Sequence, residues 1–404
     1  MSRTPWLIRL LRPTYGKWLL RHYDVSLKGY EHIPKKGPFL IIGNHVHTYD
    51  SLFLSASTPF HIHWVIGAIL FKTKFFRFIF HTGIEGIAKQ QGKSDLHTIK
   101  GMRSRLNEGG VVGFFPEGTR TWDGESLPIN KATAKLIRLF NVPVVVVHLE
   151  GAFGSKPRWG HKRRKGPITL NVVKVIHKGD LKNKSVEEVV TLINRYLVHS
   201  YNDWQQKHHV PYYSDNKAQG IENILYACPV CHSFSSIKGV KNTFICKKCD
   251  SAWEINEYDE ILPIKEAHFY PTIASWHTWE VSYLEESSRK KPDFSIFSLD
   301  DGVLFQLASS TQLTRLSKDF SFTATPTAFV LKVNTFEKLK TPFKSDEFFF
   351  YFNDINSIVI NVKSTLEFTY NNTIYRVRIK PNQSILKYME LYQIHQKIVL
   401  MESM

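Results

Sequence analysis

The fold of this chain is decided by residues 38–50, which read Pro-Phe-Leu-Ile-Ile-Gly-Asn-His-Val-His-Thr-Tyr-Asp. The stretch begins with an apolar run that predicts a buried strand, and Gly43 ends it. His45 and Asp50 follow, and open α/β sheets bind their ligands at this end of the strands. Residues 38–50 therefore predict a strand, a turn and a functional site in one stretch.

Two interpretations of His45 and Asp50 are compatible with their spacing. In the first, one strand-to-helix turn holds both side chains, and Asp50 accepts a hydrogen bond from one imidazole nitrogen while the other nitrogen stays basic. This arrangement is a general base for a substrate that brings its own hydroxyl, so that no Ser or Cys nucleophile is needed. In the second, Asp50 only caps a helix and His45 has no chemical role.

A second apolar run, residues 111–115, leads into Pro116-Glu117-Gly118-Thr119-Arg120. Gly118 permits a tight bend, Arg120 offers a guanidinium fork that fits phosphate, and Glu117 can orient a hydroxyl or hold the arginine. Alone, the pentapeptide is also typical of an ordinary surface turn. Its place after a buried strand, in a chain that already carries the histidine–aspartate pair, favours a role in the same site.

The remaining pattern of the first half predicts an α/β fold. Residues 142–149 are almost uniformly apolar, which is typical of a strand in a parallel sheet covered on both faces. Further strands are expected at residues 83–89 and 168–175, and helices at residues 94–107 (with Ser94 as N-cap), 131–140 and 185–204. We therefore expect a mostly parallel sheet flanked by helices. The run Arg158 to Lys165 holds five cations and a Trp, and follows these strands.

Three segments together resemble the glycerolipid acyltransferase family, specifically the 1-acyl-sn-glycerol-3-phosphate acyltransferases. They are Asn44-His45 with Asp50, Phe115 to Arg120, and Val142 to Gly151, in the family's order and with its separations. Residues 83–89, which end in a cation, resemble the family's glycerol-phosphate motif. The resemblance extends over roughly residues 30–200 and implies a glycerolipid acyltransferase-like fold.

The resemblance also implies a reaction and a set of site residues. His45 would deprotonate the acceptor hydroxyl, which attacks an acyl thioester on coenzyme A or acyl carrier protein, and Asp50 would orient His45. With 1-acylglycerol-3-phosphate, a lysophospholipid, as acceptor, the product is phosphatidate. The residues that would bind the acceptor's phosphate and glycerol are Lys89, Glu117, Gly118, Thr119 and Arg120.

Three positions depart from the family's pattern. Lys89 stands where the family usually has Arg, Val146 where a second Pro is usual, and Ala132 where a Gly is usual. A lysine binds phosphate without the bidentate fork of an arginine. The departures leave the histidine–aspartate pair intact, so they bear on the acceptor, for which glycerol-3-phosphate or another lysophospholipid also fits.

The formal charge of +17 lies entirely in the first half of the chain. Residues 1–215 hold 32 Lys and Arg against 15 Asp and Glu, whereas residues 216–404 hold 21 of each. Such a surface attracts phosphate-bearing partners, either nucleic acid or anionic lipid. Because the second half has no net charge, we expect phosphate-bearing partners to bind the half that carries His45.

Two basic, aromatic stretches predict contact with a membrane surface. Residues 5–21, which Pro13 is expected to break into two helices, and residues 71–80 have the composition of helices that lie in the headgroup layer. Residues 71–80 are equally compatible with a core helix whose cations snorkel. No secretory signal and no spanning apolar run of about 18 residues is visible. We expect a cytoplasmic protein bound peripherally to an anionic membrane, at its cytoplasmic face.

All four cysteines lie in two Cys-x-x-Cys pairs, Cys228/Cys231 and Cys246/Cys249. Their spacing predicts a four-thiolate zinc site, which would be structural because four ligands close the coordination shell. Disulfides are the alternative. The segment resembles a zinc ribbon, and many ribbons bind nucleic acid or protein. A non-catalytic binding protein is therefore the alternative function, although the few lysines around the cysteines do not favour nucleic acid as the partner.

We expect three domains. Residues 1–214 form the acyltransferase domain with its N-terminal membrane-interface helices, residues 222–262 the zinc ribbon, and residues 263–404 a mainly β domain. Residues 205–223 are polar and turn-rich, and predict a linker. Seven strands are expected after Pro263, at residues 295–299, 302–307, 327–333, 347–352, 357–362, 365–370 and 373–379, with a hairpin at Asn371-Asn372. A C-terminal helix is expected at about residues 384–401, and the whole pattern loosely resembles a pleckstrin-homology-like barrel.

Overall fold

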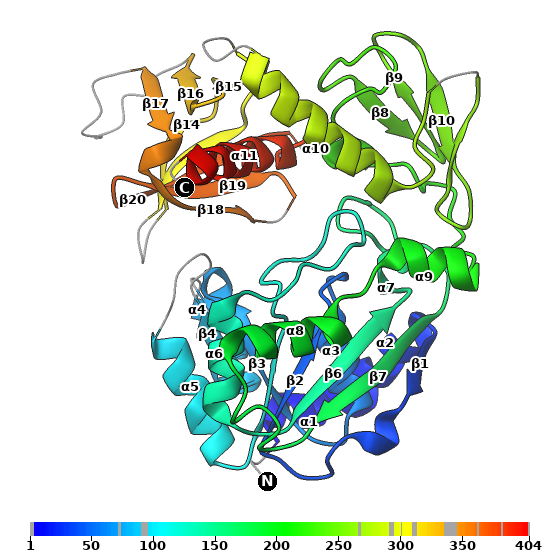
Figure 1. Ribbon diagram of the computed structural model, residues 1–404, viewed down its shortest axis with the longest axis vertical. Helices are drawn as coiled ribbons and strands as arrows, with labels where there is room; N and C mark the ends of the chain where they lie inside the picture. Colours follow the sequence, from blue (N-terminus) through cyan, green and yellow to red (C-terminus); the bar gives the residue numbers. More distant parts are fainter. Residues whose placement is uncertain are drawn as a thin grey trace. The chain divides into compact units, whose positions relative to one another are not determined.

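Two compact units make up the chain in the computed structural model (Figure 1). The N-terminal unit contains the chain up to Arg158 and residues 162–214, and the C-terminal unit contains residues 159–161 and the chain from Asp215. The structure describes residues 4–71, 74–89, 96–265, 268–290, 295–299, 301–308, 313–334, 346–361, 363–380 and 383–402. The predicted N-cap Ser94 and parts of the predicted stretches 71–80 and 357–362 lie outside these residues. The division into three domains stays a prediction.

A seven-stranded sheet forms the centre of the N-terminal unit, in the order β1-β7-β6-β2-β5-β3-β4. All neighbouring strands are parallel except β6 and β7. Their bounds are β1 Val25–Lys28, β2 Phe39–Gly43, β3 Ile62–Gly67, β4 Ile87–Lys89, β5 Val111–Phe114, β6 Val144–Glu150 and β7 Ile168–Ile176. The mostly parallel sheet confirms the predicted α/β fold.

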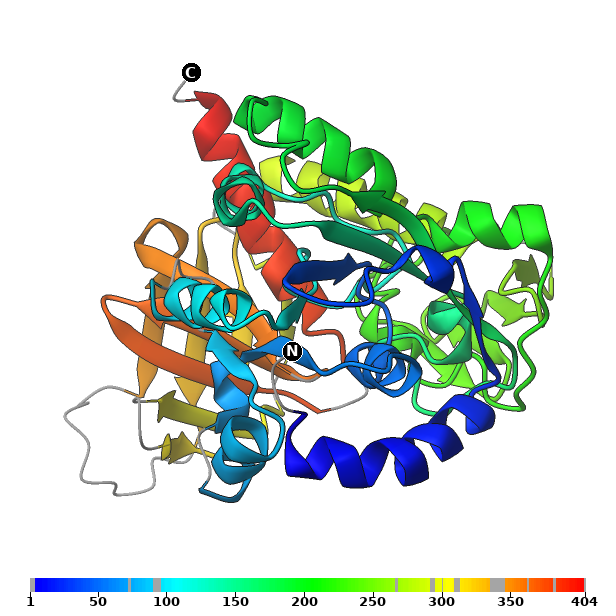
Figure 2. The ribbon, with the colours of Figure 1, turned by 90° about the horizontal axis from the view of Figure 1, so that it is seen from below.

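Helices cover both faces of this sheet (Figure 2). The helices of the N-terminal unit are α1 Trp6–Leu11, α2 Lys17–His22, α3 Asp50–Ser57, α4 Lys74–Arg77, α5 Leu96–Asn107, α6 Lys131–Phe140, α7 Ala152–Ser155, α8 Val186–Leu197 and α9 Tyr201–His208. Two π-helical turns, η1 Arg12–Gly16 and η4 Phe78–Gly83, and two short 3-10 turns, η2 Tyr30–His32 and η3 Ala68–Phe71, complete the unit.

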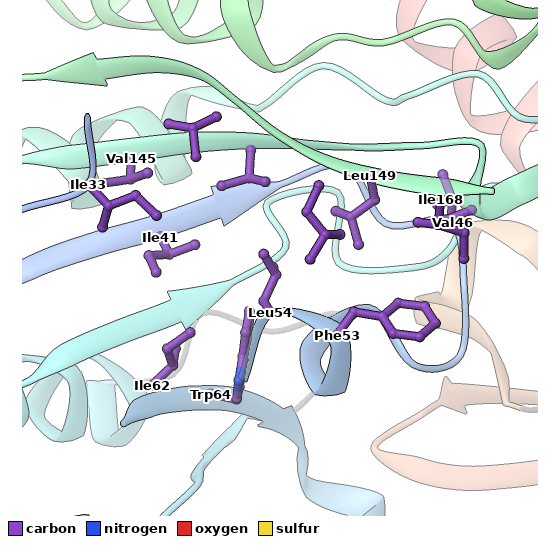
Figure 3. Close-up of a cluster of buried hydrophobic side chains, with 14 of the residues drawn as sticks. Ile33, Ile41, Val46, Phe53, Leu54, Ile62, Trp64, Val145, Leu149 and Ile168 are labelled. Atoms are coloured by element: carbon purple, nitrogen blue, oxygen red, sulfur yellow. The ribbon is translucent and has the colours of Figure 1, made fainter. Parts of the chain in front are cut away.

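Successive side chains of the central strands point to opposite faces of the sheet, and each face has its own hydrophobic core. All five residues of β2 are buried; Phe39 and Ile41 pack with α2 and α3, whereas Leu40 and Ile42 pack with α5, α6 and α8. Figure 3 shows the first core, where Ile41 lies among side chains that include those of α3. Because neither face of β2 is left to solvent, the strand is uniformly apolar, as its sequence predicted.

The prediction that Pro13 breaks the N-terminal helix is wrong. Helical backbone runs from Trp6 to His22, and the wide turn η1 accommodates the proline, with Lys17 N–H bonded to the carbonyl of Arg12. The Arg12 side chain also holds the helix in place, because its three nitrogens donate to carbonyls in the last turn of α3 and just after it, those of Ser55, Pro59 and Phe60.

Residues 185–204 form two helices, where the sequence predicted one. α8 begins with a capping box of Ser185 and Glu188, and it ends before Val198, whose backbone is extended. α9 then begins with a new cap, because Ser200 accepts a hydrogen bond from Asp203 N–H. The Ser-x-x-Asp pattern was a local signal for this second start.

The segment with the cysteines folds as a small antiparallel sheet in the order β11-β10-β9-β8. Its strands are β8 Ile237–Val240, β9 Thr243–Cys246, β10 Ala252–Ile255 and β11 Ile261–Pro263, and the short turn η5 Ile221–Asn223 precedes them. Part of the predicted linker 205–223 is therefore ordered as helix, in the last residues of α9 and in η5.

The rest of the C-terminal unit is mainly β, as predicted, and ends in the helix α11 Leu386–Glu402. Two antiparallel sheets have the orders β12-β15-β16-β17 and β14-β13-β20-β19-β18, and the turn η6 Phe352–Asp354 follows β17. The strands are β12 Phe297–Leu299, β13 Leu304–Ala308, β14 Leu313–Ser317, β15 Phe320–Ala324, β16 Ala328–Val333, β17 Glu347–Tyr351, β18 Ile355–Asn361, β19 Thr365–Tyr370 and β20 Thr373–Arg378. Asn371 and Asn372 both have positive φ, which confirms the predicted hairpin.

Two features of this region differ from the prediction. β14 and β15 were not expected, and residues 273–290, where strands were expected to dominate, form the helix α10 Ile273–Lys290. The helix contains Trp, Val and Tyr residues that favour strands. Its buried positions recur every three or four residues, at Ile273, Trp276, Glu280, Leu284 and Ser288, so tertiary packing overrides local propensity.

Candidate active site

The turn between β2 and α3 holds the histidine and the aspartate together. Asp50 Oδ2 lies 2.8 Å from His45 Nδ1, and it also accepts the backbone N–H groups of Val46 at 2.8 Å and His47 at 2.9 Å. The carboxylate thus fixes the backbone of the turn and the imidazole at once. This geometry is the one that the first interpretation of the sequence requires.

Stacked aromatic rings fix the plane of the imidazole. Phe115 lies parallel to the His45 ring, with centroids 4.2 Å apart and an angle of 10°, and Trp64 stacks on Phe115 at 5.1 Å. The Asp50 side chain is fully buried, whereas 25% of the His45 side chain remains exposed. The ring is therefore held in one orientation and is still open to a substrate.

The electrostatic surroundings favour the neutral form of His45. Burial lowers the pKa of His45 from its ordinary value of 6.5, and the charges of Arg120 and Arg158 lower it further. The hydrogen bond and the charge of Asp50 act in the opposite direction. Because Nδ1–H faces the carboxylate, the lone pair on Nε2 of the neutral ring is available as a base.

The turn after β5 lies against the His45 turn, as the sequence predicted. Glu117 Oε1 accepts His45 N–H at 2.8 Å, and Thr121 N–H donates to the His45 carbonyl at 2.9 Å. The strands β2 and β5 are adjacent and parallel, so their C-terminal ends meet at one edge of the sheet. Two turns that are far apart in sequence are therefore joined by hydrogen bonds on both sides of the histidine backbone.

Both carboxylate oxygens of Glu117 accept hydrogen bonds from backbone N–H groups. Its second oxygen accepts Leu127 N–H at 3.2 Å, so each carboxylate oxygen holds a different part of the chain. Burial nonetheless raises the pKa of Glu117 to about 8, against the effect of these two hydrogen bonds. The contact of Glu117 with the acceptor stays a prediction, and the structure gives it a role in joining the turns.

Gly118, Thr119 and Arg120 form the outer part of the same turn. Gly118 has a φ of +71°, a conformation that favours glycine, and a Cβ there would meet no neighbouring atom. Arg120 Nη1 donates to Thr48 Oγ1 at 2.9 Å, which places its guanidinium beside the His45 turn. The charge of Arg120 is close enough to lower the pKa of His45.

Arg158 is a residue of this site that the sequence analysis missed. Its Nη1 donates to Thr119 Oγ1 and to the Arg120 carbonyl, both at 2.7 Å. In the sequence it was only one member of a run of cations. A usable signal was its place soon after β6, because β6 is parallel to β2 and ends at the same edge of the sheet.

Lys89 ends β4 at this edge, two strands away from β5. Its side chain is exposed, and the structure records no hydrogen bond or ion pair between it and the described residues. The structure thus joins His45 directly to Asp50 and to Glu117. Arg120 reaches the same turn through Thr48, and Thr119 is joined to Arg158. The structure does not join Lys89 to them, and the predicted phosphate contact of Lys89 stays a prediction.

The four cysteines converge within the C-terminal unit. The Sγ atoms of Cys228, Cys231, Cys246 and Cys249 all lie within 4.8 Å of one another. The closest pairs are Cys228 with Cys249 at 3.7 Å and Cys231 with Cys246 at 3.6 Å, which excludes a disulfide in this arrangement. A tetrahedron of sulfurs around zinc, with Zn–S bonds of about 2.3 Å, has edges of about 3.8 Å. The cluster therefore fits the predicted metal.

The two Cys-x-x-Cys turns have matching backbone geometry. His232 follows the first pair and Asp250 the second, and both have positive φ and donate N–H to the carbonyl of the first cysteine of their pair. Two equivalent turns from separate parts of the sequence therefore present four thiols to one point. This duplication is the local reason that the cluster forms.

Comparison with known proteins gives a family match that lies within the N-terminal unit. Residues 24–150 match a family model described as Acyltransferase. The chain is 30% identical over 139 residues to a 1-acyl-sn-glycerol-3-phosphate acyltransferase of Helicobacter pylori. This alignment covers 33% of this chain and 59% of that protein. It is 23% identical over 184 residues to the protein of the same name from Bacillus subtilis. That alignment covers 45% of this chain and 89% of the relative. The chain thus covers less than two thirds of the first relative.

A solved structure is also similar. It is described as the 1-acyl-sn-glycerophosphate (LPA) acyltransferase, PlsC, from Thermotoga maritima, and it aligns with a TM-score of 0.39 and 21% identity. The alignment covers 46% of this chain and 77% of that chain. The family match itself extends over the strands β1 to β6, and so includes both turns of the site.

Proposed function

Residues 24–150 form a domain of the acyltransferase family, and from this premise we propose that the protein makes phosphatidate. It transfers a fatty acyl group from a thioester donor to the free hydroxyl of 1-acylglycerol-3-phosphate. The names of both bacterial relatives support this choice of reaction and acceptor. The donor is acyl-CoA or acyl carrier protein.

One observation carries the proposal. His45 Nδ1 lies 2.8 Å from a fully buried carboxylate, while part of the ring stays exposed beside the turn of Arg120. A base oriented by a carboxylate and set next to a guanidinium suits a substrate that has both a hydroxyl and a phosphate. Residues 44–50 thus supply the general base, and residues 116–120 supply the cation that binds the phosphate of the acceptor.

The reaction uses His45 as base and then as acid. His45 Nε2 takes the proton of the acceptor hydroxyl while the oxygen forms a bond to the thioester carbonyl carbon. The tetrahedral intermediate collapses, the C–S bond breaks, and the departing thiolate takes the proton back from Nε2. The ester and the free thiol are the products, and Asp50 stabilises the imidazolium that exists between the two steps.

The N-terminal segment supports peripheral binding to an anionic membrane at the cytoplasmic face. Trp6, Leu10 and Trp18 expose 54%, 59% and 51% of their surface, on a helical segment that contacts η4, where Phe78 is 56% exposed. The first half of the chain also carries the whole net positive charge. Among the described residues, no helix combines the length and the apolarity that crossing a membrane requires. Aromatic and basic groups together favour the headgroup layer, where the lysophospholipid acceptor lies.

The cysteine cluster holds a structural zinc ion in this proposal. The four thiols would supply all four ligands, so the ion has no open position for a substrate. The ribbon of residues 222–262 and the mainly β domain of residues 263–404 then form the two parts that follow the acyltransferase domain of residues 1–214. Zinc would fix the two cysteine turns to each other.

The test is an acceptor panel with the purified full-length protein. Lysophosphatidate, glycerol-3-phosphate and other lysophospholipids are each offered with acyl-CoA and with acyl carrier protein thioesters, and the product lipid is identified by mass. Phosphatidate from lysophosphatidate is the expected product. Turnover of glycerol-3-phosphate alone, or of no acceptor with either donor, contradicts the proposal.

A further inference from the structure

Arg158 is a buried cation that supports the turn of Thr119 and Arg120. Both hydrogens of its Nη1 are engaged by this turn, one by Thr119 Oγ1 and one by the Arg120 carbonyl, each at 2.7 Å. The guanidinium carbon lies 4.3 Å from the centre of the Trp122 ring, and only 4% of the residue is exposed. The guanidinium is therefore held in one position by hydrogen bonds and by a cation–π contact.

Arg158 and Arg120 place two like charges next to the proposed base. Burial and the charge of Arg120 lower the pKa of Arg158 to about 9, so Arg158 is charged at neutral pH. Both charges also reach His45, because each lowers the pKa of the imidazole. Two neighbouring cations in a partly desolvated site repel each other, and an anion bound beside Arg120 relieves that repulsion.

The charge of the anion decides how much repulsion is relieved. A phosphomonoester is close to a dianion at neutral pH, because its second pKa is about 6. A phosphodiester headgroup carries one negative charge on its phosphate at the same pH. A site with two fixed cations consequently discriminates between the two headgroups, whereas a site with Arg120 alone does so less strongly.

We propose that Arg158 sets the selectivity of the enzyme for an acceptor with a phosphomonoester headgroup. It acts as a positioning residue, because it fixes the turn of Thr119 and Arg120 and adds a second charge behind it. The inference rests on the proposed function and deepens it, by naming the residue that separates lysophosphatidate from lysophospholipids with a phosphodiester. Lys89, the cation expected from the sequence, is not the residue that the structure joins to Arg120.

The experiment compares two acceptors in the wild type and in three variants. Arg158→Gln removes the charge, Arg158→Lys keeps it, and Lys162→Gln removes an exposed charge from the same loop as a matched control. Arg158→Met, which keeps an apolar stem on Trp122, replaces Arg158→Gln if that protein does not fold. For each variant, kcat/KM is measured with 1-acylglycerol-3-phosphate and with a lysophospholipid whose headgroup is a phosphodiester, and the ratio of the two values is the readout.

We expect Arg158→Gln to lower this ratio about tenfold or more, mainly through KM for the phosphomonoester. Arg158→Lys should restore most of it, and Lys162→Gln should leave it unchanged. In the wild type the ratio should rise as pH passes the second pKa of the phosphate, near 6. Because both acceptors use the same base, titration of His45 cancels in the ratio.

Two results overturn the proposal. One is an unchanged ratio in the Arg158→Gln or Arg158→Met protein, including an equal loss of activity with both acceptors, which indicates a purely structural role. The other is a wild-type ratio that is independent of pH, which removes the role of the dianion whatever the variants do. Failure of the wild type with every acceptor would contradict the proposed function itself, and is thus a separate outcome.

Discussion

Asp50 Oδ2 lies 2.8 Å from Nδ1 of His45, and this single oxygen also receives the N–H groups of Val46 and His47. The carboxylate is therefore part of the turn that carries the histidine. A change at Asp50 alters the imidazole tautomer and the local backbone together. Both the rate of the reaction and its pH dependence therefore depend on this one carboxylate.

Replacing Asp50 with Asn should lower kcat by about 10²- to 10⁴-fold. The amide can donate to Nδ1, which moves the imidazole proton to Nε2 and removes the lone pair that acts as base. Steady-state assays with lysophosphatidate measure the effect, and circular dichroism checks the fold. A folded Asp50→Asn protein with nearly wild-type kcat would show that the carboxylate does not orient the base.

The pH profile of kcat/KM should have its acidic limb below pH 6.5. The environment lowers the pKa of His45 from 6.5, and the base works only when neutral, so activity rises with pH through the lowered pKa and is then constant. Asp50→Asn should move the limb to still lower pH, because Asp50 raises this pKa. A limb centred well above pH 7 in the wild type would assign the titration to another group.

Glu117 should make the protein less stable as pH rises from about 4.5 to about 8. Burial raises the pKa of Glu117 from 4.5 to about 8, so within this window the folded protein binds a proton that the unfolded chain has lost. The resulting stabilisation is full below pH 4.5 and is lost as pH passes 8. The difference in Tm between wild type and Glu117→Gln should decrease across the window. Glu31→Gln, at an exposed carboxylate, is the control, and equal slopes for all three proteins would contradict the assignment.

The cysteine cluster should bind one zinc ion per chain. Cys231→Ser should lose the metal and the amide protection of residues 226–255 in hydrogen exchange, because metal binding drives the folding of such small domains. Val230→Ser, at an exposed position between the same two cysteines, should keep both. Full protection of this segment in a metal-free wild-type protein would contradict a structural role for zinc.

The exposed tryptophans of the N-terminal segment should contribute to membrane binding. Replacing Trp6 and Trp18 together with Ser should weaken binding to vesicles that contain phosphatidylglycerol by about tenfold or more, because two large side chains no longer leave water. Leu139→Ser, at an equally exposed position on α6, is the matched control. An equal loss of vesicle binding in both proteins, or no loss in the double variant, would show that the membrane does not bind at these tryptophans.

The local sequence predicts the site well where the two turns follow buried strands. The strand β2 and the run 111–115 are apolar because both faces of the sheet are covered, and parallel neighbours bring their ends to one edge. The meeting of the two turns could therefore be predicted from the local sequence patterns, without knowledge of any long-range contact. For Arg158 the place after β6 indicated the same edge of the sheet, but not which cation of the run lies in the site. Its partners are a hydroxyl and a carbonyl of another turn, and a run of cations has no periodicity that marks one of them as buried.

The missed elements of the C-terminal unit have a different cause. In α10, strand-favouring side chains form a helix because Trp276 packs on Phe244 and Trp253, and because Glu280 accepts the backbone N–H groups of Tyr226 and Ala227. These contacts link residues far apart in sequence. Propensity within a short window does not contain them.

The loss of activity in His45→Ala tests the central claim most directly. Purified wild type, His45→Ala and, as control, His32→Ala at an exposed histidine are assayed for phosphatidate formation from lysophosphatidate and an acyl thioester. We expect a loss of at least about 10³-fold in kcat/KM for His45→Ala, with an unchanged Tm, and none for His32→Ala. A folded His45→Ala protein that retains transfer within about tenfold of the wild type would contradict the account.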